Sequence, residues 1–207
     1  MITARLALVA AIVGLALPRG AAAQFCFRSG RAPKCKSQAV TEFMIGARFK
    51  EVDPLAENLL VASSELGVLV NAGSRSAFGG TVLAGVNGGG TRLGLKGRYR
   101  HCLSETVALD VSPGILVAGT TSSSLGNMST PGFTGHVGVT WKDWAGLSVQ
   151  YESVRFDDGL GAEQTDASVV VGARMGSSAG IVSSVLALGF VIVYVVAAGN
   201  TQYQERR

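Results

Sequence analysis

The side chains that could carry out catalysis or bind a metal ion are few, and their spacing matches no motif for such chemistry. The 207 residues include two histidines, His101 and His136, whose separation fits no zinc-binding pattern, so we expect each at the surface or at an interface. No Gly-x-Ser-x-Gly sequence of a hydrolase occurs. The run Gly88-Gly89-Gly90 lacks the Lys-Ser/Thr of a phosphate-binding loop, so a hairpin turn is the better interpretation. We therefore expect no enzyme activity, no metal and no cofactor.

Acidic residues gather around one predicted turn, where Asp157, Asp158, Glu163 and Asp166 offer oxygen ligands that calcium prefers. The spacing is not that of an EF-hand, and a solvated hairpin tip explains the cluster better. The net charge is +4 and charged residues make up 15% of the chain. No basic cluster with interleaved aromatic residues occurs, so we expect no nucleic-acid partner.

The three cysteines allow one disulfide if the chain is exported. Cys26 and Cys35 bracket a short basic loop and are the favoured pair, which leaves Cys102 as a free thiol. Pairing of Cys102 with either of the first two, or three buried free thiols, are the alternatives.

Alternation of apolar and polar residues predicts the elements that would position these side chains. Between residues 41 and 175 the period is two, which is typical of strands with one apolar and one polar face. Turn signals separate the runs at Asn87-Gly88, at residues 112–114 (Ser-Pro-Gly), at Lys142-Asp143 and at Asp158-Gly159. Residues 53–62 could form one short helix. The pattern predicts a mainly β fold, an antiparallel meander of about eight strands that forms a sandwich or a barrel.

The predicted apolar faces and the polar faces opposite them are as follows: Phe43, Ile45, Ala47 and Phe49 opposite Glu42, Met44 and Arg48; Leu93, Leu95 and Tyr99 opposite Arg92, Lys96, Arg98 and Arg100; Val107, Leu109 and Val111 opposite Thr106, Ala108, Asp110 and Ser112; Val137, Val139 and Trp141 opposite His136 and Thr140; Leu147, Val149 and Tyr151 opposite Ser148, Gln150 and Glu152; Val169, Val171 and Ala173 opposite Ser168 and Arg174.

Two apolar segments flank this predicted β-domain. Residues 1–23 have the charged start, apolar middle and small-residue end of a secretory signal, either cleaved or retained as an anchor. Residues 180–199 contain no charged side chain, and a helix of that length spans about 30 Å, the thickness of a bilayer core. We therefore predict a transmembrane helix at 177–199, a β-domain at 24–176 and a tail at 200–207. A buried strand pair or a core helix is the alternative for the apolar run.

One face of the predicted helix carries small side chains, namely Gly180, Ser183, Ser184 and Ala187, at spacings that bring them together. In lipid, small side chains allow close helix packing, so this face is a candidate contact for another subunit.

The sequences GRYRHCLSETVALDVSPG (97–114) and VGVTWKDWAGLSVQYESVRF (137–156) resemble those of small bacterial outer-membrane-type barrels, where strands and tight turns repeat in this way. The resemblance implies an outer-membrane barrel with a porin-like or structural role. The chain departs from that pattern after residue 175, where an apolar segment replaces a terminal aromatic residue, and aromatic residues are only 7%. We therefore favour a water-soluble β-domain whose apolar face points inward.

These observations predict a non-enzymatic, single-span accessory subunit of the bacterial inner membrane. Its periplasmic β-domain would dock on a larger complex, for example a respiratory or photosynthetic one, and its partners would be lipid and other subunits. Arg206 and Arg207 after the span favour a cytoplasmic tail. Trp141 and Trp144 would contact a partner, contact lipid headgroups, or cap the core. The alternatives are an outer-membrane barrel, and a hydrolase or ligand binder whose site is assembled in three dimensions.

Overall fold

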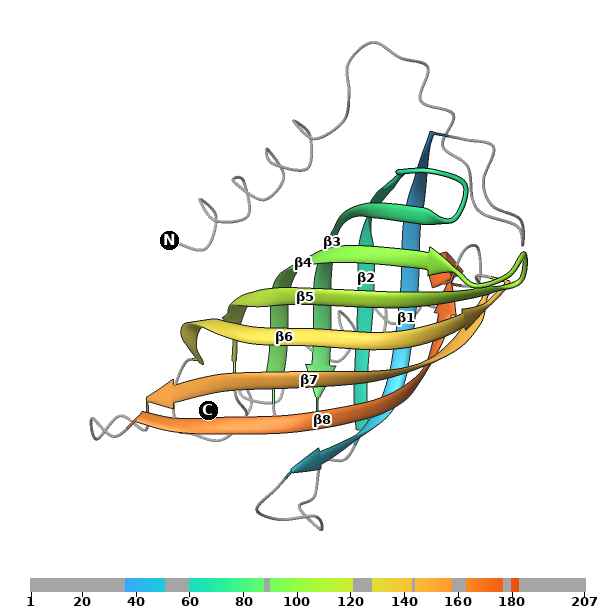
Figure 1. Cartoon of the computed structure of the whole chain (residues 1–207). Coiled ribbons are helices and arrows are strands. Elements are labelled where there is room, and N and C mark those ends of the chain that lie inside the picture. Colours follow the sequence, from blue (N-terminus) through green and yellow to red (C-terminus); the bar gives the residue numbers. More distant parts are fainter. Residues whose placement is uncertain are drawn as a thin grey trace, which may run out of the picture.

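A computed structural model describes residues 36–50, 60–87, 90–120, 128–142, 144–157, 163–176 and 180–182. These residues form eight β-strands (Figure 1). The strands are β1 (Ser37–Lys50), β2 (Leu60–Asn71), β3 (Ser76–Asn87), β4 (Gly90–Cys102), β5 (Val107–Gly119), β6 (Met128–Trp141), β7 (Ala145–Asp157) and β8 (Glu163–Gly176).

Each strand pairs antiparallel with the next, and β8 pairs with β1, so the sheet closes into a barrel. The predicted antiparallel meander of about eight strands is confirmed, and it forms a barrel, not a sandwich. Closure pairs every strand on both sides, which removes the exposed edges that an open sheet would present.

The strands are steeply inclined to the barrel axis. A path of directly paired residues that leaves β1 at Val40 passes once around the barrel through β2 to β8. It returns to β1 at Lys50, ten residues further along that strand (50 minus 40). A barrel of eight strands with this stagger is narrow, and its interior is just wide enough for side chains to fill.

The two ends of the barrel differ. Residues 72–75, 103–106 and 142–144 connect strands at the end where β1 begins and β8 ends, which we call the short-turn end. The other end, the loop end, carries the connections 51–59, 88–89, 120–127 and 158–162. Of the predicted turns, 87–88, 142–143 and 158–159 fall between strands, whereas 112–114 does not, because Pro113 lies inside β5. On the neighbouring strand β4, Gly97 and Arg98 have no directly paired residue in β5. This gap in the pairing fits Pro113, because proline has no N–H to donate.

Several expectations concern residues at the edge of the described structure or beyond it. The signal segment 1–23, Cys26 and Cys35 lie outside the described residues, and so does most of the predicted helix at 53–62, although Leu60–Asn71 form β2. Of the predicted transmembrane helix, residues 180–182 are described and form a helical turn. Ser183, Ser184 and Ala187 lie outside the described residues. Within the described part of the chain, no helix is long and apolar enough to cross a membrane.

Candidate functional site: a charged interior inside an apolar surface

The predicted alternation is correct, but the expected direction of the two faces is wrong. The apolar face points away from the barrel axis and is exposed, while the polar and charged face points inward and is buried. The hydrophobic residues Leu147 and Val137 are 69% and 51% exposed, whereas the charged residue Asp110 is 0% exposed. A water-soluble domain would show the opposite arrangement. The preference for an inward apolar face is therefore corrected.

The outward faces of the strands are almost free of charge. Among described side chains on the strands, Arg155, near the loop end of β7, is the one charged residue that is exposed. The exposed apolar residues on the strands come from all eight of them: Ile45, Phe49, Leu60, Leu66, Val70, Phe78, Leu95, Val111, Ile115, Val117, Phe133, Val137, Val139, Trp141, Leu147, Val149, Tyr151, Val169, Val171 and Met175. An exposed apolar surface that surrounds a protein far exceeds what water-soluble monomers present.

Several aromatic side chains lie at the short-turn end of this surface. At the short-turn end, the rings of Trp141 and Trp144 are 5.8 Å apart, and the ammonium of Lys142 lies 4.7 Å from the centre of the Trp141 ring. Both tryptophans are about half exposed. The rings of Phe78 and Tyr99, also near this end, contact each other at a tilt, with centres 4.8 Å apart. Amphipathic rings at such positions suit a membrane interface.

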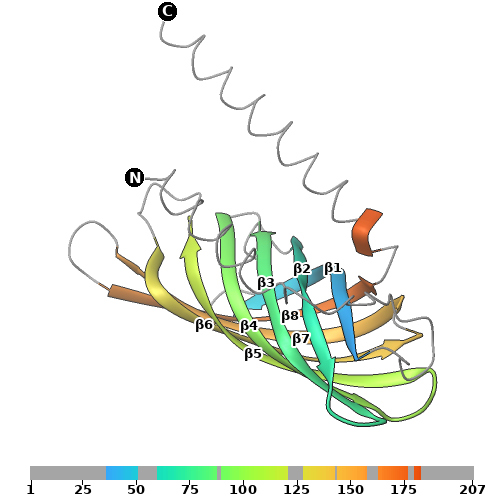
Figure 2. The same cartoon turned by 90° about the horizontal axis from the view of Figure 1, so that it is seen from above.

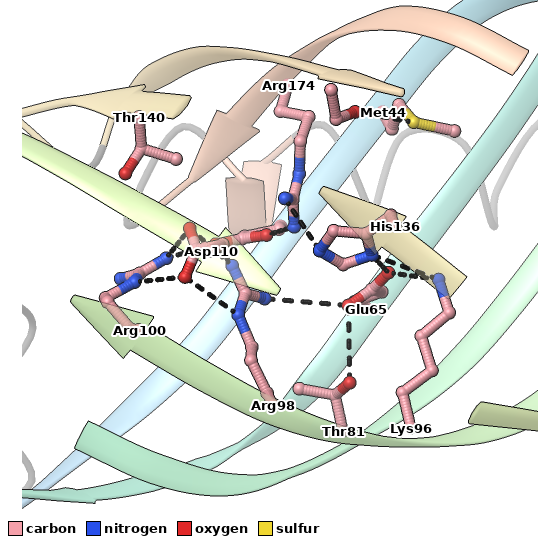
Figure 3. A network of polar contacts seen from close by, with 12 residues as sticks. Met44, Glu65, Thr81, Lys96, Arg98, Arg100, Asp110, His136, Thr140 and Arg174 are labelled. Atoms are coloured by element: carbon pink, nitrogen blue, oxygen red, sulfur yellow. Dashed lines mark hydrogen bonds and ion pairs between the residues drawn. The ribbon is translucent and has the colours of Figure 1, made fainter. Parts of the chain in front are cut away.

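The interior contains a network of ion pairs (Figure 3). Its first part is centred on Glu42 of β1, whose carboxylate accepts hydrogen bonds from Arg98 at 2.6 Å and Arg100 at 2.8 Å, both on β4. Arg174 of β8 also donates to Glu42. Asp110 of β5 accepts two hydrogen bonds from Arg100, at 2.7 and 2.9 Å, and one from Arg98 at 3.3 Å. Two carboxylates therefore hold three guanidinium groups.

The second part of the network is centred on Glu65 of β2. Lys96 donates to Glu65 at 2.9 Å and to Gln150 at 3.1 Å, and Thr81 donates to Glu65 at 3.2 Å. Arg98 also approaches this carboxylate at 3.5 Å, which joins the two parts. Gln150 in turn donates to Glu152 at 2.7 Å, and this extends the polar contacts toward the loop end.

His136 links the two parts and was expected at the surface or at an interface, whereas it is buried inside the barrel. Its Nε2 lies 2.9 Å from Nη1 of Arg174, which can only donate, so Nε2 accepts. Its Nδ1 lies 3.3 Å from the Glu65 carboxylate and 3.2 Å from the ammonium of Lys96. This arrangement assigns a neutral imidazole to His136.

The interior fits its long side chains because glycines face several of them. Gly79 pairs with Arg98, and Gly114 pairs with Lys96. A Cβ at Gly114 would lie 2.5 Å from Cγ of Lys96, and one at Gly79 would overlap the carbonyl oxygen of Val68. These positions exclude larger residues, since the space is already filled.

The other residues that the sequence analysis considered lie elsewhere. Asp166, one of the acidic residues weighed as a calcium ligand, pairs with Arg48 at 2.8 Å. No cluster of metal-binding side chains occurs among the described residues. Asp158, Gly88 and Gly89 lie outside them. His101 lies near the short-turn end with its Nδ1 3.1 Å from the Ser76 hydroxyl. Cys102 is a buried free thiol, which fits both the Cys26–Cys35 pairing and the alternative of three free thiols, so the disulfide stays a prediction.

Comparison with known proteins assigns no family. No family model matches the chain, and no curated protein matches it. Among solved structures, the chain is similar to a protein described as "De novo design of transmembrane beta-barrels". The two share 14% sequence identity, with a TM-score of 0.40, over 70% of this chain and 98% of that one. At this level of similarity, the membrane location of the designed protein cannot be assigned to this chain. The location of this chain has to be inferred from its own surface.

Sequence reasoning missed the interior network as a functional unit. Its signal was present in β4, where Arg92, Lys96, Arg98 and Arg100 all occupy one face. Four cations on a single strand face need anions nearby if they are buried. Glu42, the anion on which three of the arginines converge, lies on the polar face of another predicted strand.

Proposed function

We propose that this protein is an outer-membrane-type β-barrel that spans a bacterial outer membrane and has a structural role. The observation that carries the proposal is the inverted distribution of side chains, apolar outside and ion-paired inside. Lipid is the solvent that favours such a surface, and a closed barrel satisfies the backbone hydrogen bonds that lipid cannot. This replaces the inner-membrane accessory subunit as the preferred interpretation.

The same geometry supports one orientation in the membrane. Barrels of this class have short turns on the periplasmic side and longer loops outside. The short-turn end of this barrel, which carries Trp141 and Trp144, would therefore face the periplasm, and the loop end would face outward. The tryptophan pair would lie among the lipid headgroups.

The interior supports a structural role in preference to a porin-like one. Side chains from β1, β2, β4, β5, β6, β7 and β8 meet near the axis, and Lys96, Arg98 and Asp110 are among the most deeply buried. Large open channels belong to barrels of about 16 strands or more, whereas eight strands leave room only for side chains or one small ligand. In planar bilayers we expect no steady conductance of porin size, and such a conductance would favour the porin-like role.

Location is tested by separating the two membranes of the producing cell on a density gradient. We expect the protein with the outer membrane, and recovery with the inner membrane would contradict the proposal. In a second test, the purified protein is reconstituted in vesicles with lipids brominated at different depths. The chain has only two tryptophans, Trp141 and Trp144, so its tryptophan fluorescence reports on the short-turn end. Because this end would lie among the lipid headgroups, quenching should be strongest for shallow bromines. Trp141→Phe and Trp144→Phe are the matched controls. A monodisperse protein in buffer without detergent would reject the membrane setting.

A further inference from the structure

The start of the C-terminal apolar segment contacts the barrel wall. Gly180 is buried, and a Cβ on it would lie 2.9 Å from the carbonyl oxygen of Met175 and would overlap that of Thr41. Met175 belongs to β8 and Thr41 to β1, so Gly180 lies at the seam where the barrel closes. The helical turn 180–182 is the red segment in Figure 2. Only a residue without a side chain fits this contact.

The seam has a step at this end. The last residue of β8, Gly176, pairs with Glu42, whereas β1 begins at Ser37. The first residues of β1 pair with β2 alone, as Ser37 does with Val70. Gly180 therefore lies where β1 extends beyond β8, beside the edge that β1 leaves open.

The position of Gly180 restricts where the apolar segment can go. Residues 177–179 reach at most about 10 Å, so the segment starts at the short-turn rim of the barrel. Residues 180–199 have no charged side chain, and as a helix they would be about 30 Å long. A helix with no charged face is unsuited to lie in the plane of the interface. Its length instead matches a bilayer core.

We propose that residues 180–199 cross the same membrane as the barrel, packed on the outer face of β1 and β8, so that residues 200–207 emerge at the loop end. This rests on the proposed membrane setting. The contact would use the small face of the segment, with the barrel wall in place of another subunit: Gly180, Ser183, Ser184 and Ala187. Small side chains allow the close approach that drives association in lipid.

The outer face of β1 and β8 is suited to this contact. Its outward residues include Thr41, Ala47, Ala167 and Ala173, among larger ones. The outward residues of β6 and β7 are bulkier, including Val137, Val139, Trp141, Leu147 and Val149. The helix would thus pack on a face with more small side chains than β6 and β7 have, and continue the contact that Gly180 makes.

Packing is tested by disulfide cross-linking in membranes, with the three native cysteines replaced by serine. Thr41 and Ala47 are six residues apart on β1, which is inclined to the barrel axis. The distance that these six residues cover along the axis equals the length of about ten residues of helix. Val191 lies eleven residues after Gly180, on the same helix face. We therefore expect Ala47→Cys and Val191→Cys to cross-link on oxidation. Two pairs serve as controls and should not react: Ala47→Cys with Val193→Cys, on the opposite helix face, and Val139→Cys with Val191→Cys, on another part of the barrel. Equal cross-linking of all three pairs, or of none, would overturn the proposed packing.

Crossing is tested by labelling intact cells with a membrane-impermeant maleimide. Single cysteines are placed at Gln204 in the tail, at Gly159 in the loop between β7 and β8, and at Ser74 in a short turn. We expect Gln204→Cys to react as Gly159→Cys does, and Ser74→Cys to react only after lysis. A tail that reacts together with Ser74→Cys would overturn the proposal whatever the cross-links show. Failure of the membrane setting is distinguishable, because Gly159→Cys and Ser74→Cys would then react alike.

Discussion

Glu42 is the residue whose replacement tests the charged interior most directly. Its carboxylate is 8% exposed and accepts hydrogen bonds from three arginines. We expect Glu42→Gln to destabilise the folded barrel strongly, because the side chain keeps its size and loses its charge. Arg98 and Arg100 would keep Asp110, and Arg98 would also keep Glu65. Arg174 would lose the carboxylate that it contacts.

The magnitude follows from the geometry. At an effective dielectric constant of about 20, one ion pair at about 3 Å contributes about 5 kcal/mol before desolvation is counted. Burial of the charges cancels most of this gain, and removal of one partner from a buried pair costs about 3–5 kcal/mol. We expect a loss of that size in the free energy of unfolding. The measurement is urea unfolding in detergent micelles, followed by the fluorescence of the two tryptophans.

Two further variants keep this prediction falsifiable. Glu105→Gln makes the same chemical change at an exposed turn residue and should leave the unfolding midpoint unchanged. In Glu42→Gln/Arg174→Gln the charge balance returns, since one anion and one cation are removed together. The double variant should lose less than the sum of the single variants, by about 1–3 kcal/mol. The reasoning is refuted if Glu42→Gln behaves like Glu105→Gln, or if the two single effects simply add.

Three other outcomes are expected. Val149→Arg should reduce stability in lipid by about 2–4 kcal/mol, while Val149→Leu should not, and a tolerated arginine would indicate that this face meets water. Gly114→Ala should lower the free energy of unfolding by about 1–3 kcal/mol, because the new Cβ would lie 2.5 Å from the Leu95 carbonyl oxygen. Gly97→Ala is the control and should leave thermal unfolding unchanged, because its Cβ would have no heavy atom nearer than 4.0 Å. Thiol labelling of the denatured, unreduced protein should mark only Cys102, and labelling at all three cysteines would reject a disulfide between the other two.

The sequence was sufficient to predict the strands and their two faces. On β4, the alternation of Arg98 and Arg100 with Tyr99 identifies two faces, and the structure has those faces. The period of two cannot say which face points inward, because it is the same in water and in lipid. Composition favoured an inward apolar face, since aromatic residues are scarce. The deciding facts are contacts between distant strands, such as Glu42 with Arg98, and pairing at that separation leaves no local pattern.

Local signals also failed where tertiary contacts override them. Ser112-Pro113-Gly114 has the composition of a turn, yet Pro113 lies within β5 where it needs no N–H partner from β4. His136 looked like a surface residue because a lone histidine on an alternating strand usually is one. Its burial depends on Glu65 and Arg174, which lie 71 and 38 positions away along the chain (136 minus 65, and 174 minus 136).

The interior network also explains how the chain selects one register. β4 supplies cations to partners on four other strands, through Glu42 of β1, Glu65 of β2, Asp110 of β5 and Gln150 of β7. The contact of Arg174 with Glu42 crosses the seam between β8 and β1, where the barrel closes. A slip of one residue in any strand would turn its inward side chains outward. An arginine or lysine moved to the lipid face near the bilayer centre costs about 2–4 kcal/mol, and its former partner would remain buried without a counter-charge. The charges that make the interior costly to bury therefore also penalise one-residue slips of the strands that carry them.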